Sequence, residues 1–355
     1  MTYELGINLS FGEILGWNFF FFYLCKKKCI KNSGQLMNNS PRIVFMGTPE
    51  FAVESLRKLV ENGYHVVGVI TMPDKPAGKH HSVLQASAVK EYALSQNLPL
   101  LQPEKLKDAD FLEQLSAWNV DLQIVVAFRM LPEVVWNMPR LGTFNLHASL
   151  LPQYRGAAPI QWAIINGEKE TGVTTFFLTH AIDTGKIIFQ ERVPIEPTDT
   201  AGILHDRLMH LGAQLVIKTV DAISNHQIQP VDQETLAVKE SDLKTAPKIF
   251  KETCVIDWNK TSSEIYNLIR GLSPYPTAWT VLQTNKGESI QCKIFESEKM
   301  IAVHSLSPGT IDSRDKTCLK IATSDGFIQV KNIQQAGKKR MSIEDFLRGN
   351  SQFLF

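Results

Sequence analysis

From Arg42 onward the sequence alternates short apolar runs with amphipathic stretches, and no other feature constrains the fold as strongly. Short apolar runs predict strands and amphipathic stretches predict helices, so their regular alternation predicts βα units around a parallel sheet. The run at 122–126 is typical of a central strand that is buried on both faces. We therefore expect an α/β fold with a Rossmann-like, mostly parallel sheet.

The boundaries of these elements follow from local signals. A proline at the first helical position and a capping threonine, Pro49 and Thr48, predict the start of the first helix. The expected strands cover 43–46, 66–71, 122–126, 143–146, 173–178 and 186–190, and the expected helices cover 51–60, 83–96, 108–118 and 201–224.

At 355 residues the chain is long enough for two domains, each with its own core. Residues 226–246 are polar with little periodicity, which indicates a linker between a catalytic domain at 41–225 and a second domain at 247–355. In the second domain, short apolar runs separated by turns predict a small β-barrel, for which an OB-like barrel is one candidate.

The first 40 residues differ from the rest. An apolar run at 14–25 is followed by three consecutive lysines and preceded by no basic residue. A secretory signal carries its positive charge first, and a membrane-spanning helix needs roughly 20 apolar residues. We expect translation to start at Met37, with residues 1–36 as upstream sequence; a disordered or interfacial tail and a membrane anchor are the alternatives.

Basic and acidic residues nearly cancel, at 37 against 36, so any contact with nucleic acid must be local. The 5 cysteines are sparse, and those beyond residue 40 form no ligand-like pairs, as expected for reduced thiols in a cytoplasmic protein. His80 and His81 have no partner at ligand spacing, so we expect no metal. The turn at 47–51 lacks the second and third glycines of the dinucleotide fingerprint, which argues against a nicotinamide or flavin cofactor.

Asn145 and His147 lie two residues apart at the end of an expected strand, so their side chains leave the same face. Open α/β sheets keep their active crevice at such strand ends. When an amine attacks a formyl carbonyl, charge builds on the oxygen, and one donor aimed there commonly lowers the barrier by about 3 kcal/mol. Asn145 is such a donor, and His147 can donate or transfer a proton near neutral pH.

A third candidate is Asp183, in an Ile-Asp-Thr-Gly turn that leads into a strand. Its carboxylate would either hold His147 protonated or accept the proton that the amine loses. Taken singly, these residues also have ordinary interpretations, because a histidine near a strand end is often structural and the aspartate of such a turn often serves as a cap.

Several motifs together carry a resemblance. They are the opening at 42–52, the stretch at 144–161 and shorter matches at 73–78, 170–174 and 335–339. On these motifs, residues 42 to about 350 resemble the folate-dependent formyltransferases, and most closely the branch of that family that acts on methionyl-tRNA. Ala148 stands where glycine is frequent in the family.

The resemblance implies 10-formyltetrahydrofolate as formyl donor, the α-amino group of initiator methionyl-tRNA as acceptor, and no metal. It places Asn145, His147 and Asp183 on the catalytic trio. The segment that it implies for binding tetrahydrofolate is Ser149, Leu150, Leu151 and Pro152. We expect a cytoplasmic monomer with no membrane contact.

The resemblance also implies tRNA contact by the loop after Pro76-Ala77-Gly78, where Lys79 stands in place of the usual arginine. Lysine keeps the charge but loses the planar fork of arginine. A late basic cluster, formed by Lys338, Lys339 and Arg340, suits phosphate contacts in the second domain. From composition alone, both groups would be ordinary solvated surface.

Other functions remain as alternatives. An amino-sugar nucleotide formyltransferase would share the trio and the folate donor, but its opening turn usually differs from the one at 46–51. A glycinamide ribonucleotide formyltransferase would be shorter and need a phosphate-binding loop. A hydrolase that frees formate from the same folate is a further alternative, as is a catalytically dead RNA-binding protein, which the intact trio disfavours.

Overall fold

The computed structural model describes residues 40–77, 83–236, 239–313, 317–350 and 353. Residues 1–39, and with them the expected start at Met37, lie outside the described residues. The chain divides into the units Met1–Pro41 and Arg42–Phe355, and the features below belong to the second. Within the described ranges, no helix is long and apolar enough to cross a bilayer.

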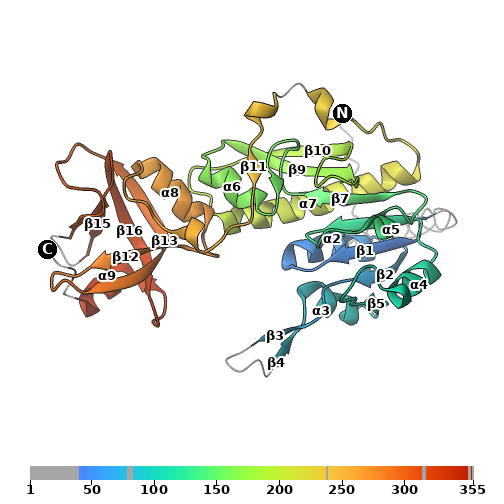
Figure 1. The fold of residues 1–355 in the computed structure, drawn as a ribbon, viewed down its shortest axis with the longest axis horizontal. Helices are drawn as coiled ribbons and strands as arrows, with labels where there is room; N and C mark the ends of the chain where they lie inside the picture. The colour runs from blue at the N-terminus through green and yellow to red at the C-terminus, as the bar shows by residue number, and fades with distance from the viewer. Residues whose placement is uncertain (1–39, 78–82, 237–238, 314–316, 351–352, 354–355) are drawn as a thin grey trace, which may run out of the picture. The chain divides into compact units, whose positions relative to one another are not determined.

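A seven-stranded sheet forms the centre of the first part of this unit. Its strands are β1 (Ile43–Gly47), β2 (Val66–Ile70), β5 (Leu100–Leu101), β6 (Leu122–Val126), β7 (Thr143–His147), β9 (Glu170–Phe177) and β10 (Ile187–Pro194). They follow the order β10-β9-β7-β6-β1-β2-β5. All pairs from β7 to β5 are parallel, whereas β9 and β10 form an antiparallel edge. The predicted Rossmann-like, mostly parallel sheet is confirmed (Figure 1).

Apolar side chains cover both faces of this sheet, because successive residues of a strand point to opposite sides. Ile43 of β1 packs in one cluster with residues of α2 (Glu50–Glu61) and α7 (Ala201–Ser224). Its neighbour Val44 packs in another cluster with residues of α4 (Ala109–Ala117) and α5 (Glu133–Trp136). Every residue of β1, β2 and β6 is buried, as expected for central strands.

The prediction of a helix that begins at Val83 is wrong for its first residues. Residues of β4 (Val83–Gln85) pair with β3 (Lys75–Ala77) as a small antiparallel hairpin. Helix α3 (Ala88–Ser95) begins only after Ser87, whose side chain accepts a hydrogen bond from the backbone N–H of Lys90. The capping serine decides this boundary, because it satisfies a free N–H of the first helical turn.

The last part of the unit is a curled antiparallel sheet with its own core, a half-barrel. Its strands and helices are β12 (Ala278–Gln283), β13 (Ser289–Ile301), β14 (Ile311–Asp312), β15 (Leu319–Ala322), β16 (Gly326–Gln335), β17 (Met341–Ser342), α8 (Ser262–Gly271) and α9 (Ile343–Gly349), preceded by η3 (Glu252–Cys254). Register shifts on either side of Glu296 bend β13 against β16. This agrees with the predicted small β domain.

Residues 226–246, here called the connecting segment, run between α7 and the half-barrel. They contain η1 (Gln233–Leu236), η2 (Glu240–Asp242) and β11 (Thr245–Ala246). Strand β11 pairs in parallel with β8 (Arg155–Gly156), just before α6 (Pro159–Ile165), and an isolated bridge joins Val231 to Ile187 of β10. The connecting segment therefore lies against β8, which follows β7, and against the start of β10, and Figure 1 shows β11 beside the sheet.

Candidate active site

Strand β7 brings Asn145 and His147 to one face of the sheet. In the register with β9, Asn145 lies opposite Phe176 and His147 opposite Thr174. The two side chains leave the strand in the same direction because they are two residues apart. His147 is buried, with 6% of its surface exposed, and Asn145 is half-buried.

The ring of His147 is oriented by the backbone. Its Nε2 lies 2.9 Å from the carbonyl oxygen of Tyr154. A carbonyl oxygen only accepts hydrogen bonds, so Nε2 carries a proton and donates it. The other ring nitrogen, Nδ1, lies 4.0 Å from Oδ2 of Asp183. The nitrogen that remains for proton transfer is therefore Nδ1, on the side of the carboxylate.

Asp183 comes from the loop between β9 and β10 and reaches His147 across 36 residues of sequence. Its backbone is left-handed, with φ 54°, which is uncommon for a residue other than glycine. Its Oδ2 also accepts a hydrogen bond of 3.0 Å from the backbone N–H of Gly156. The carboxylate thus faces the imidazole on one side and a backbone donor on the other.

The backbone of Asn145 pairs with β6 and β9, but its side-chain amide makes no hydrogen bond with any residue that the structure describes. Asn145 is half-buried in the middle of β7, on the same face of the sheet as His147. An amide donor in this position is available to a carbonyl oxygen of a bound substrate.

The segment Ser149–Pro152 is held by buried hydrogen bonds. The hydroxyl of Ser149, which is fully buried, donates to the carbonyl of Gln153 at 2.6 Å. Thr174 Oγ1 donates to the carbonyl of Ser149 at 2.6 Å and accepts from the N–H of Leu151 at 3.2 Å. Gln190 Nε2 donates to the carbonyl of Leu151 at 2.8 Å. Ser149 is therefore buried and fixes the backbone of the segment, whereas Leu150, Leu151 and Pro152 line a cavity.

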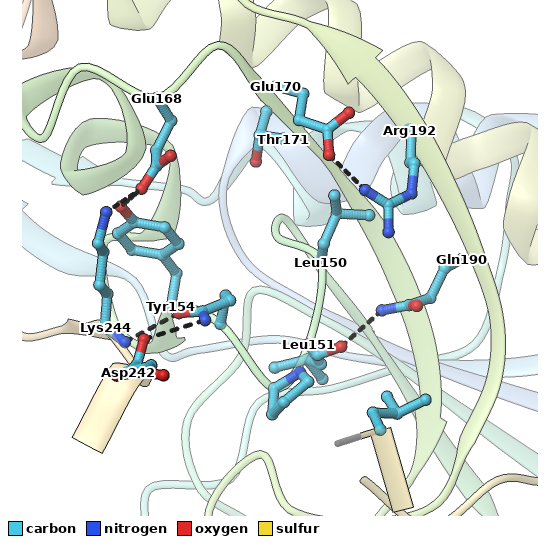
Figure 2. Close-up of a pocket in the computed structure, with 13 residues that line it drawn as sticks. Leu150, Leu151, Tyr154, Glu168, Glu170, Thr171, Gln190, Arg192, Asp242 and Lys244 are labelled. Atoms are coloured by element: carbon cyan, nitrogen blue, oxygen red, sulfur yellow. Dashed lines mark hydrogen bonds and ion pairs between the residues drawn. The ribbon is translucent and has the colours of Figure 1, made fainter. Parts of the chain in front are cut away.

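That cavity has a volume of about 500 Å³ and is shown in Figure 2. Its walls include Leu150, Leu151 and Pro152 of the expected folate-binding segment, and none of Asn145, His147 and Asp183 lines it. Two ion pairs flank it, Lys244 with Glu168 at 2.5 Å on one side and Arg192 with Glu170 on the other. The remaining lining residues are Gln153, Tyr154, Thr171, Gln190, Leu236 and Asp242.

Tyr154 and Glu168 share a short hydrogen bond of 2.6 Å at this wall. Burial and the hydrogen bond to Glu168 raise the pKa of the Tyr154 phenol. Burial alone would raise the pKa of Glu168, but hydrogen bonds from Lys244 and Tyr154 outweigh it and lower that pKa. Glu168 is therefore an anion at neutral pH, and it fixes the residue whose carbonyl orients His147.

The expected tRNA contacts lie apart from this centre in the sequence. Lys338, Lys339 and Arg340 are exposed in the turn between β16 and β17, and the guanidinium of Arg340 lies 4.6 Å from the ring centroid of Phe295. Lys79, with His80 and His81, lies outside the described residues. In the part of the chain that the structure describes, no group of three or more His, Cys, Asp or Glu side chains is placed to hold a metal ion.

The structure adds residues that the pattern of the sequence did not single out. Gly156 donates to Asp183, Tyr154 accepts from His147, and Thr174 bridges Ser149 and Leu151. Gln233 of the connecting segment binds the loop of Asp183. A polar linker composition carries no signal for such a contact, since a glutamine there is ordinarily solvated.

The comparisons with known proteins identify the family of this chain. A formyl transferase family model matches residues 41–220, and a model of the formyl transferase C-terminal domain matches residues 248–351. A protein of Bacteroides thetaiotaomicron named methionyl-tRNA formyltransferase is 63% identical over 308 residues, covering 87% of this chain and 95% of that protein. A Phocaeicola vulgatus protein of the same name is 65% identical over 308 residues, covering 87% and 95%.

Solved structures support the fold. The sugar 3N-formyl transferase WlaRD, determined with dTDP and 5-N-formyl-THF, matches with a TM-score of 0.58 at 22% identity, over 84% of this chain and 99% of that one. An N-formyltransferase from Helicobacter canadensis, in complex with folinic acid and dTDP-3-aminofucose, gives 0.58 at 22% identity, over 85% and 100%. The family predicted from the motifs is confirmed: this chain belongs to the formyl transferases, on the branch of the methionyl-tRNA formyltransferases.

Proposed function

We propose that this enzyme transfers the formyl group of 10-formyltetrahydrofolate to the α-amino group of initiator methionyl-tRNA, giving N-formylmethionyl-tRNA for translation initiation. The observation that carries the chemistry is the meeting of His147 Nδ1 and Asp183 Oδ2, at 4.0 Å, beside the free amide of Asn145. The relatives named methionyl-tRNA formyltransferase, at 63% and 65% identity, support the choice of acceptor.

The proposed reaction is a direct attack. The methionine nitrogen bonds to the formyl carbon, the carbonyl oxygen becomes an oxyanion, and the bond from carbon to N10 of the folate then breaks. The amine loses one proton and N10 gains one, so the transfer needs no net acid or base. Bringing the two substrates together supplies much of the acceleration, because the donor is already an activated amide.

Each member of the trio has a role in this scheme. Asn145 donates to the oxyanion, worth about 3 kcal/mol for one such donor. His147 transfers the proton through Nδ1, because Nε2 is hydrogen-bonded to the carbonyl oxygen of Tyr154. Asp183 stabilises the imidazole while that ring carries the second proton.

Substrate binding is proposed for two regions. Leu150, Leu151 and Pro152 would contact the folate from the cavity wall, with Ser149 holding their backbone in place. Lys79 of the catalytic domain at 41–225, and Lys338, Lys339 and Arg340 of the domain at 247–355, would neutralise tRNA phosphates. We place the enzyme in the cytoplasm, as a monomer.

Formyl transfer with purified components tests the proposal. Labelled 10-formyltetrahydrofolate is offered with initiator methionyl-tRNA, or with a dTDP-amino sugar, as acceptor. We expect label on the tRNA only; label on the sugar would replace the acceptor, and release of free formate alone would indicate a hydrolase.

The variant His147→Ala should lower kcat by orders of magnitude while the protein stays folded. His65→Ala, at an exposed histidine outside the site, is the matched control and should leave kcat unchanged. Near-normal turnover of His147→Ala would remove this residue from the mechanism.

A further inference from the structure

We infer that Gln233, in the connecting segment, is a positioning residue that holds Asp183 in reach of His147. The inference rests on the proposed function, since it assigns Gln233 a part in the reaction of the same trio. It makes the connecting segment a component of the active site as well as a link between two domains.

Gln233 is buried, with 4% of its surface exposed, and its amide is fully used. Nε2 donates to the carbonyl oxygens of Asp183, at 2.9 Å, and Gly185, at 2.8 Å. Oε1 accepts from Arg155, at 3.1 Å from Nε and 2.6 Å from Nη2. An amide has two N–H donors and two lone pairs on its oxygen, so all four positions are satisfied. A side chain whose hydrogen-bonding positions are all satisfied holds the groups around it in one geometry.

The loop of Asp183 has a conformation that requires such support. Asp183 adopts a left-handed backbone, which is strained and persists only where neighbouring contacts impose it. Gly185 lies so close to Phe177 that an added Cβ would be 1.6 Å from the Phe177 carbonyl oxygen. Gln233 binds the carbonyls on both sides of Thr184, and thereby fixes the turn that aims the carboxylate.

The connecting segment also binds Tyr154, whose carbonyl oxygen faces the opposite side of the imidazole. The backbone N–H of Tyr154 donates to the carbonyl of Lys244 at 2.6 Å, and the carbonyl of Tyr154 is the acceptor for Nε2 of His147. Arg155 and Gly156 pair with Thr245 and Ala246. Both groups that face the ring, a carbonyl at Nε2 and a carboxylate at Nδ1, are therefore held by this segment.

Gln233→Leu tests the inference, because leucine keeps most of the volume and removes all four hydrogen bonds. Gln233→Glu is the second variant: it keeps an acceptor for Arg155 but removes both donors to the loop of Asp183. Gln229→Leu, at an exposed glutamine of the same segment, is the matched control. Steady-state formyl transfer is measured for each, well below its melting temperature, with the donor and the tRNA varied separately.

We expect kcat to fall by about 10²-fold in both Gln233 variants, the loss typical of a 1 Å misplacement, with KM for the folate within about twofold of the parent. The backbone amide resonance of Gly156 is the second measurement, since it reports the hydrogen bond to Asp183. Asp183→Ala gives the reference position for the broken bond, and the Gln233 variants should move the resonance toward it. Gln229→Leu should change neither quantity.

The inference is overturned if Gln233→Leu and Gln233→Glu keep the kcat of the parent, or lose it while the Gly156 resonance stays in place. It is also overturned if only Gln233→Leu is impaired, because the acceptor for Arg155 would then be the group that matters. Failure of the proposed function looks different: Asp183→Ala and His147→Ala would then transfer formyl groups as well as the parent does.

Discussion

Replacing Gly156 with alanine perturbs the centre at a crowded backbone position. The glycine has φ 128°, which side chains rarely tolerate, and a Cβ built on it lies 2.4 Å from the carbonyl oxygen of Ala246. The obstacle is backbone, so it cannot rotate away. To increase the distance from this Cβ to the Ala246 oxygen to 3.4 Å, an ordinary van der Waals contact, β8 and β11 must move apart by about 1 Å.

The magnitude is the sum of two contributions, a backbone strain and one lost hydrogen bond. Backbone strain of this kind costs about 1–3 kcal/mol. Losing the hydrogen bond from the Gly156 N–H to the Asp183 carboxylate costs about 1.5–3 kcal/mol more. We therefore expect Gly156→Ala to lower the free energy of unfolding by about 2.5–6 kcal/mol and kcat by about 10²-fold.

Urea unfolding and steady-state formyl transfer measure these two quantities. Gly63→Ala is the control, since Gly63 also has a positive φ, 75°, but an added Cβ there meets nothing within 4 Å. Gly63→Ala should lower the free energy of unfolding only by the cost of a left-handed backbone at alanine, about 1–2 kcal/mol, and should leave kcat unchanged. If Gly156→Ala loses no more stability than Gly63→Ala and keeps its turnover, the close packing of β8 on β11 does not support the site.

Asn145→Ala should lower kcat by about 10²- to 10³-fold with little change in KM, as measured by steady-state transfer, because it removes one oxyanion donor. Hydrogen bonds lower the pKa of Glu168, so its carboxylate stabilises the fold above pH about 4.5, and this stabilisation is lost as the pH falls. The melting temperature of Glu168→Gln should therefore vary less between pH 5 and pH 3 than that of the parent. An equal variation would contradict the assignment. Replacing Lys338 and Lys339 by glutamine should reduce the slope of log affinity for tRNA against log salt by about 2.

Much of the fold follows from local pattern. The alternation of apolar runs and amphipathic stretches predicted the parallel sheet, and the strand containing Asn145 and His147 was placed to within one residue at its end. The hairpin of β3 and β4 was missed, because Val83 and Leu84 resemble the first turn of the helix that Ser87 in fact begins. A capping residue inside an apolar stretch separates two elements that periodicity alone merges.

The geometry of the site, too, follows partly from the local sequence and partly from the tertiary structure. The spacing of Asn145 and His147 alone puts both on one face, because the strand period is two. Only the tertiary structure brings Asp183 to Nδ1, assigns the proton of Nε2 through the carbonyl of Tyr154, and sets Gln233 against the loop of Asp183. These contacts join segments up to 50 residues apart, and they depend on loop conformations and strand register that the packed core decides and no local pattern of side chains encodes.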